Sequence, residues 1–121
     1  MVSFKLNYKL WLEKENKVFG PGPAALLEFV ETYGSLHRAA GEMEMSYSQA
    51  WNLISTLETR LGFSLITSQA GGRGGGGSKL TEEGKKLLKR FREFEEQADS
   101  NLSRLAEKYF SQEFMQKLQE E

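Results

Sequence analysis

The 121-residue sequence predicts an α+β fold that is mostly helical, and three observations carry this prediction. Apolar residues recur at spacings of three and four over several stretches, which is the period of an amphipathic helix. Short strand-like stretches lie on both sides of a glycine-rich run. The first residues of the chain alternate between apolar and polar side chains, which is the period of a strand.

The N-terminal stretch predicts a β-hairpin followed by a helix. The alternation over residues 4–13 predicts a first strand. Residues 15–16 suit the turn, and residues 17–19 suit a short return strand. A Gly-Pro-Gly-Pro sequence then breaks the chain. Pro23 suits the first turn of a helix that runs to about Tyr33, because proline has no N–H to leave unpaired there.

A second helix follows after a tight connection. Gly34 is typical of a helix C-terminus, and Ser35 is typical of the N-cap of the next helix, which is expected over residues 36–42. Its two adjacent alanines would let a neighbouring helix cross closely. Residues 44–45 form the expected turn into a third helix. The residues expected to be buried in the second helix are Leu36, Ala39, Ala40 and Met43.

The third helix, from its cap at Ser46 to about Leu61, has two unlike faces. One face is apolar, and the opposite face carries hydroxyl and amide groups with almost no charge, whereas a solvated helix face usually carries Lys and Glu. Such groups can hydrogen-bond to base edges, so the second and third helices predict a helix-turn-helix unit whose third helix enters a DNA groove. The apolar face consists of Ala50, Leu53, Ile54, Leu57 and Leu61. The expected DNA contacts are Ser46, Tyr47, Ser48, Gln49, Trp51, Asn52, Ser55 and Thr56.

These interpretations have plainer alternatives. The polar side chains of the third helix could form a solvated face of low charge, but the missing Lys and Glu residues favour DNA contact. Tyr47 and Trp51 could equally well pack at the edge of the core.

A wing is predicted after the third helix. Residues 63–67 and 78–80 have the character of two short strands, and between them Arg73 stands among six glycines. Bare backbone amides and one Arg suit contact with phosphates or a minor groove, although Arg73 could instead be a solubilising charge in a linker. Lys79 and the backbone amide of Ser35 complete the expected DNA contacts. The glycine run lacks the Lys-Ser/Thr ending of a nucleotide-binding loop.

A long helix is predicted after its cap at Thr81, with residues 111–121 as a final short helix or frayed end. An apolar stripe follows its length, and nothing N-terminal is large enough to bury all of it. A second copy of the chain is the simplest cover, so we expect a homodimer. The predicted organisation, within one domain, is a winged helix-turn-helix with a leading hairpin over residues 1–80 and a dimerisation helix with its tail over residues 81–121. The stripe consists of Leu87, Phe91, Phe94, Ala98, Leu102, Leu105 and Tyr109.

Composition narrows the possible functions. The sequence has no Cys and one His, so thiolate and multi-histidine metal sites are excluded, and no cofactor is expected. No nucleophilic side chain has a candidate general base, which argues against an enzyme. No apolar run approaches the roughly 20 residues of a membrane span, and a cytoplasmic setting is expected. The net charge of -1 argues mildly against a nucleic-acid binder. Binding would therefore rely on a few positioned cations and backbone amides.

Two motifs carry a family resemblance. Ser46-Tyr47 with Ala50-Trp51 looks like an SY-x-x-AW pattern, and residues 71–77 followed by Leu80-Thr81 and Gly84 look like a GG-K/R-GGGG wing joined to LT-x-x-G. Both patterns resemble the N-terminal DNA-binding domain of the molybdate-responsive (ModE) regulator family. Residues 29–84 also resemble the winged helix-turn-helix of LysR-type regulators.

The resemblance implies a sequence-specific homodimeric transcription regulator that binds double-stranded DNA. The third helix would enter the major groove, with the wing beside it. The sensor domain of the family should follow the long helix, and this sequence ends at Glu121, so no molybdate binding is expected. Ser68 stands where the family tends to have Arg. Together with the net charge of -1, it favours the alternative function, a protein-interaction module that has lost DNA binding.

Overall fold

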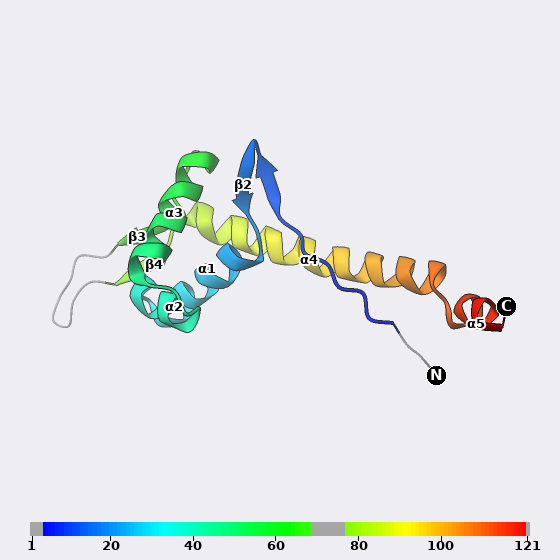
Figure 1. Ribbon diagram of the computed structural model, residues 1–121. Coiled ribbons are helices and arrows are strands. Elements are labelled where there is room, and N and C mark those ends of the chain that lie inside the picture. Colours follow the sequence, from blue (N-terminus) through cyan, green and yellow to red (C-terminus); the bar gives the residue numbers. More distant parts are fainter. Residues whose placement is uncertain (1–3, 69–76, 121) are drawn as a thin grey trace. The chain divides into compact units, whose positions relative to one another are not determined.

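A computed structural model describes residues 4–68 and 77–120 of the chain (Figure 1). The predicted mostly helical α+β fold with two small hairpins is confirmed. The elements in chain order are β1 (Leu12–Lys14), β2 (Asn16–Phe19), α1 (Pro21–Tyr33), α2 (Leu36–Glu42), α3 (Tyr47–Leu61), β3 (Ile66–Ser68), β4 (Ser78–Leu80), α4 (Glu82–Tyr109) and α5 (Gln112–Glu120).

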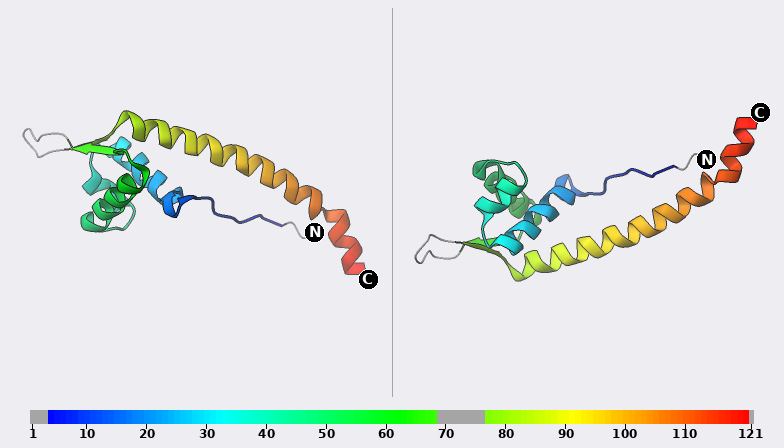
Figure 2. Two further views of the ribbon diagram at one scale, coloured as in Figure 1. Left: turned by 90° about the horizontal axis from the view of Figure 1, so that it is seen from above. Right: turned by 90° about the horizontal axis from the view of Figure 1, so that it is seen from below.

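The chain divides into two units. We call residues 10–92 the winged unit, and the described residues of 4–9 and 93–120 the arm unit. Helix α4 contributes its first turns to the winged unit and its remaining turns to the arm unit. Figure 2 shows α1, α2 and α3 grouped beside the wing strands. No described helix is both long enough and apolar enough to cross a membrane.

The core of the winged unit lies between α1, α2, α3 and the start of α4. Ala39, Ala40 and Ala50 are almost completely buried, and their small side chains allow α2 and α3 to pack closely. The Phe19 ring meets the Phe91 ring edge-on, with 5.2 Å between centroids, which ties the N-terminal hairpin to α4. The buried cluster consists of Phe19, Ala24, Leu26, Leu27, Val30, Leu36, Ala39, Ala40, Ala50, Ile54, Leu57, Leu65, Leu80, Leu88 and Phe91.

The helix ends lie close to where the sequence predicts them. Gly34 and Gly62 end α1 and α3 in the left-handed conformation, with φ of 66° and 87°. The Ser35 hydroxyl accepts a hydrogen bond from the Arg38 N–H and caps α2. Helix α1 begins at Pro21, two residues before Pro23, so both prolines fall in its first turn.

The strands differ most from the prediction. The expected strand over residues 4–13 is wrong for residues 4–11, because only Leu12–Lys14 pairs with β2. Alternation predicts which side chains share a face, but a strand also needs a hydrogen-bonded neighbour, and β2 has only four residues. The strand expected over residues 63–67 is likewise shifted to Ile66–Ser68, which pairs with the three residues of β4.

The arm unit has little internal burial. None of its described side chains is buried. The Tyr8 hydroxyl donates a hydrogen bond of 2.6 Å to the Asp99 carboxylate on α4. The expected short terminal helix is present as α5, and the Ser111 hydroxyl accepts the Phe114 N–H at its start. A groove of about 800 Å³ lies between the N-terminal segment and α4 and α5, with Phe4, Phe110 and Met115 among its lining residues.

Candidate nucleic-acid interface

The outer face of α3 exposes most of the residues predicted to contact DNA. Tyr47 and Trp51 are 48% and 53% exposed, and Ser48, Asn52 and Thr56 are also exposed. Ser55 is half-buried. The helix is held in place by its other face, whose buried side chains are Ala50, Ile54 and Leu57. No charged residue occurs from Tyr47 to Thr56, so this surface offers hydroxyl, amide and aromatic groups to a partner.

The first turn of α3 uses two of the predicted contact residues for its own capping box. The Ser46 hydroxyl accepts the Gln49 N–H at 3.1 Å, and the Gln49 Oε1 atom accepts the Ser46 N–H at 2.9 Å. Gln49 therefore keeps its Nε2 group as a free donor, while its Oε1 atom is already engaged and is less available for the bidentate contact that recognises adenine. The Asn52 side chain is exposed and makes no hydrogen bond to the described residues, so both ends of its amide can face a base edge.

Two side chains of α2 lie against aromatic rings beside this face. The Arg38 guanidinium lies 4.3 Å from the centre of the Tyr33 ring, and the His37 ring lies 5.9 Å from the Tyr47 ring. Ser35 is half-buried, and its hydroxyl oxygen is the cap of α2. Its predicted phosphate contact would therefore rest on backbone N–H groups at the start of α2.

The wing strands are anchored on both sides. On β4, the Ser78 N–H donates to the Gly34 carbonyl at 2.9 Å, and the Ser78 hydroxyl accepts the Leu36 N–H at 3.4 Å. Lys79 is exposed on the same strand and pairs with Thr67 of β3. Arg73, the other predicted wing contact, lies outside the described residues.

The start of β3 is held by a carboxylate from α3. One oxygen of Glu58, Oε2, accepts the N–H groups of Leu65 and Ile66 at 2.6 and 3.2 Å. The Leu65 carbonyl accepts the Thr81 N–H at 3.0 Å, and the Leu65 side chain is fully buried. Helix α3, the start of β3 and the start of α4 therefore meet at the backbone of Leu65 and Ile66.

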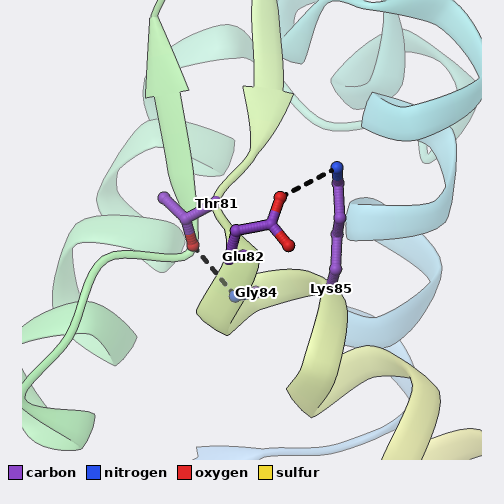
Figure 3. Close-up of polar contacts among 4 residues, drawn as sticks. All are labelled: Thr81, Glu82, Gly84 and Lys85. Atoms are coloured by element: carbon purple, nitrogen blue, oxygen red, sulfur yellow. Dashed lines mark hydrogen bonds and ion pairs between the residues drawn. The ribbon is translucent and has the colours of Figure 1, made fainter.

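The start of α4 fits closely against the Leu65 backbone. The Thr81 hydroxyl accepts the Gly84 N–H at 2.9 Å and donates to the Ser64 carbonyl at 2.6 Å, which confirms Thr81 as the predicted cap. Figure 3 shows this cap beside the ion pair of Glu82 and Lys85. A Cβ atom on Gly84 would overlap the Leu65 carbonyl oxygen, so the glycine is needed for the close approach.

Sequence reasoning missed Glu58 as a structural anchor. A lone carboxylate seven residues before a strand is not a recognisable pattern, because its use depends on how the chain turns at Gly62. It also missed Arg60, which donates to the Lys17 carbonyl at 2.8 Å and joins α3 to the hairpin. Gly84 did carry a signal, since a glycine in the first turn of a helix costs conformational entropy without an evident local benefit.

One predicted dimer residue needs correction. Phe91 is only 2% exposed and belongs to the core, because Phe19 of the hairpin covers it. Leu87 is partly buried against the same core. The sequence also gave no place in the core to Leu88, which is buried there. The other members of the stripe lie in the arm unit: Phe94, Leu105 and Tyr109 are exposed, and Ala98 and Leu102 are half-buried.

Comparison with known proteins identifies the family. The family described as "Bacterial regulatory helix-turn-helix protein, lysR family" matches residues 24–85, which run from α1 to the first turn of α4. The chain belongs to this family. The match includes α2, α3 and both wing strands, but not the N-terminal hairpin that Arg60 of α3 also contacts. No group of three His, Cys, Asp or Glu residues that could hold a metal ion occurs in the described part of the chain.

Several curated proteins are similar to the chain. Molybdenum transport protein ModE of Azotobacter vinelandii is 40% identical over 83 residues, which are 69% of this chain and 31% of that protein. Molybdenum-pterin-binding protein MopB of Rhodobacter capsulatus is 35% identical over 77 residues, 64% of this chain and 28% of that protein. DNA-binding transcriptional dual regulator ModE of Escherichia coli (strain K12) is 32% identical over 80 residues, 65% of this chain and 30% of that protein. The chain thus spans less than a third of each relative.

A solved structure supports the same fold. The crystal structure of ArgP from Mycobacterium tuberculosis superposes with a TM-score of 0.52 and 24% identity, covering 73% of this chain and 31% of that chain. The similarity to LysR-type and ModE regulators predicted from the two motifs is confirmed by the family match and by these relatives.

Proposed function

We propose that the chain is a sequence-specific DNA-binding transcription regulator of the ModE type, and that α3 is its recognition helix. One observation carries the proposal: α3 presents an outer face of hydrogen-bonding groups without charge, while its inner face is locked into the core. Such a face suits base edges in the major groove. The names of the relatives, which include a DNA-binding transcriptional dual regulator, support the same function.

The side chains would divide between base and phosphate contacts. Ser48, Asn52 and Thr56 face outward and would read base edges, with Ser55 at their margin and Gln49 contributing its Nε2 donor. Tyr47 and Trp51 would flank the groove. Phosphates would be met by Lys79, by Arg73, and by Ser35 and Ser46 through N–H groups at the starts of α2 and α3.

A homodimer is the second part of the proposal. The apolar residues of α4 beyond Phe91 that are exposed or half-buried would pack against a second copy, and these residues are Phe94, Ala98, Leu102, Leu105 and Tyr109. The two recognition helices would then lie about 34–36 Å apart, which matches half-sites one turn apart on DNA. A dimer that placed both α3 helices away from one DNA face would contradict this.

We further propose that the protein is not an enzyme, acts in the cytoplasm, and binds no molybdate through the residues of this sequence. The relatives are regulators or molybdenum-binding and transport proteins by name. The family match lies over residues 24–85, which belong to the winged unit.

The test is DNA binding measured by fluorescence anisotropy at several salt concentrations. The DNA would be sequences enriched from a random library by the protein itself, compared with unselected duplex. Asn52→Ala should relax preference at one base pair by about 1–3 kcal/mol. Lys79→Ala should weaken binding to both DNAs and reduce the salt slope by about 1.

The matched control is Lys86→Ala, which removes the same charge from an exposed position of α4 that is not among the predicted DNA contacts. It should leave both affinities close to those of the parent protein. If no sequence is enriched and no binding occurs at low salt, the regulator function is refuted, and a protein-interaction module takes its place.

A further inference from the structure

The backbone of Leu65 is held on both sides by residues of different helices. Its N–H donates to the Glu58 carboxylate of α3 at 2.6 Å, and its carbonyl accepts the Thr81 N–H at the start of α4. The same carboxylate oxygen also accepts the Ile66 N–H, where β3 begins. A charged acceptor makes these hydrogen bonds shorter and stronger than neutral ones.

This arrangement fixes the direction in which the wing leaves the core. The first residue of β3 pairs with Leu80, the last residue of β4, so the root of the wing is the Ile66–Leu80 pair. Glu58 holds one side of that root, while Ser78 is held by the junction between α1 and α2. A change at Glu58 would therefore alter the angle between the wing and α3 without touching any side chain on the outer face of α3.

The charge of Glu58 is costly for a DNA-binding surface. The segment of residues 35–80 contains only four cations, and Glu58 is one of its three anions. A carboxylate on the recognition helix repels phosphates, and removing it would strengthen binding to any DNA if electrostatics alone mattered. Glu58 is half-buried rather than projecting freely, and its Oε2 atom is engaged by two backbone N–H groups.

We propose that Glu58 is a positioning residue that sets the orientation of the wing relative to α3 and thereby the preference for specific over non-specific DNA. The inference rests on the proposed function, because it assumes that α3 and the wing engage the same duplex. Base contacts by α3 and phosphate contacts by the wing form together only when the two elements have a fixed geometry. Non-specific binding needs no such alignment.

The experiment compares Glu58→Ala and Glu58→Gln with the parent protein. Glutamine keeps a carbonyl acceptor of similar reach but loses the charge, so it separates the hydrogen bonds from the electrostatics. Glu31→Gln is the matched control, because it removes one negative charge from an exposed position of α1. Each variant is measured for affinity to the enriched sequence and to unselected duplex, for thermal stability, and for hydrogen exchange at the Leu65 and Ile66 amides.

For Glu58→Ala we expect the ratio of specific to non-specific affinity to fall about tenfold, while non-specific affinity stays equal or rises. The Leu65 and Ile66 amides should lose protection in the absence of DNA. Glu58→Gln should lower the ratio of specific to non-specific affinity by less than Glu58→Ala does. Equal gains in both affinities, with the ratio unchanged, would show an electrostatic role only and overturn the proposal.

A double-mutant cycle with Lys79→Ala separates positioning from general stability. If Glu58 aligns the wing, Lys79→Ala should weaken specific binding less in the Glu58→Ala background than in the parent. Additive effects together with a lowered melting temperature would show a merely structural role and overturn the proposal. If Glu58→Ala fails to fold, the same cycle is run with Glu58→Gln.

The failure of the proposed function is distinguishable from failure of this inference. A parent protein that binds no DNA removes the specificity role altogether, while the hydrogen-exchange comparison still reports whether Glu58 holds the root of the wing. A parent protein that binds specifically, with a ratio that Glu58→Ala leaves unchanged, refutes this inference alone.

Discussion

The winged unit buries its apolar residues within the chain, whereas the arm unit leaves most of its large apolar residues exposed. Every buried hydrophobic side chain of the described chain lies between Val18 and Phe91, within the winged unit. The arm unit has none, yet it carries most of the large exposed hydrophobic side chains: Phe4, Leu6, Tyr8, Phe94, Leu105, Tyr109, Phe110, Phe114 and Leu118. The first unit therefore has a core of its own, and the second leaves its large apolar side chains exposed, as the proposed dimer contact requires.

Helix α4 has buried apolar residues near its start and exposed apolar residues further along. Leu88 and Phe91 are covered by residues of the winged unit, whereas Leu105 and Tyr109 further along the same helix remain exposed. The apolar period continues along the helix, so period alone does not tell which part packs within the chain and which part awaits a partner. Three predictions test this contrast, beginning with the largest effect.

The strongest test compares two leucines of α4. Leu88 is 6% exposed and Leu105 is 48% exposed. Leu88→Ala should destabilise the folded chain by about 2–5 kcal/mol at any protein concentration, because it leaves a cavity in the core. Leu105→Ala should change stability only as far as a second copy covers that residue, so its effect should grow with protein concentration. Urea denaturation at several protein concentrations measures both.

Equal losses of stability for Leu88→Ala and Leu105→Ala would contradict the contrast between the two units. A large loss for Leu105→Ala that does not depend on concentration would mean that the arm unit is buried within a single chain. Sedimentation of the same Leu105→Ala protein should show a shift toward monomer, and an unchanged mass would argue against α4 as the dimer contact.

A second prediction tests the close approach of Gly84 to the Leu65 backbone in the winged unit. A Cβ atom there would lie 3.1 Å from the Leu65 carbonyl carbon and would overlap its oxygen. Gly84→Ala should therefore cost about 1–3 kcal/mol and displace the root of the wing. Gly41→Ala is the control, since nothing lies within 4 Å of its added Cβ atom. In helix α2 this control should be neutral or stabilising by up to about 1 kcal/mol. Thermal unfolding of the two proteins gives the answer, and equal melting temperatures would refute the close approach.

The sequence predicted the helices of the winged unit well because their ends have local causes. Gly34, Ser46 and Gly62 fix the ends of α1 and α3 through their own backbone and side-chain geometry. The alternation of residues 4–11 predicted a strand wrongly, because a strand depends on a neighbour elsewhere in the chain.

The candidate interface was predictable in outline and less so in detail. The outward face of α3 followed from its missing charges, but the loss of one amide end of Gln49 to the capping box depends on side-chain geometry. Glu58 could not be found from the sequence, since its partners are backbone N–H groups placed by the turn after α3. The predicted caps bond backbone N–H groups three residues away, whereas the partners of Glu58 lie seven and eight residues along the chain, where no local pattern marks them.

The smallest effect concerns the hydrogen bond between Tyr8 of the N-terminal segment and α4 in the arm unit. The Tyr8 hydroxyl donates to Asp99, and this bond is the main reason that the pKa of Tyr8 is raised from 10.0 to about 12; partial desolvation and the charges of Asp99 and Glu95 add to it. The folded chain keeps the phenolic proton between these two values while an unfolded chain has lost it. The contribution of the Tyr8–Asp99 hydrogen bond to the stability of the folded chain is thus complete below about pH 10 and is lost as the pH rises through about 12.

Absorbance titration of the phenolate, with Tyr8→Phe to assign the residue, measures this directly. Asp99→Asn should return the Tyr8 titration toward pH 10, whereas Glu107→Gln, which removes another carboxylate of the arm unit, should leave it near 12. If Tyr8 already titrates near pH 10 in the parent protein, residues 4–9 are not held on α4 in solution. The arm unit would then be exposed along a longer stretch, and the contrast with the winged unit would be greater than the structure indicates.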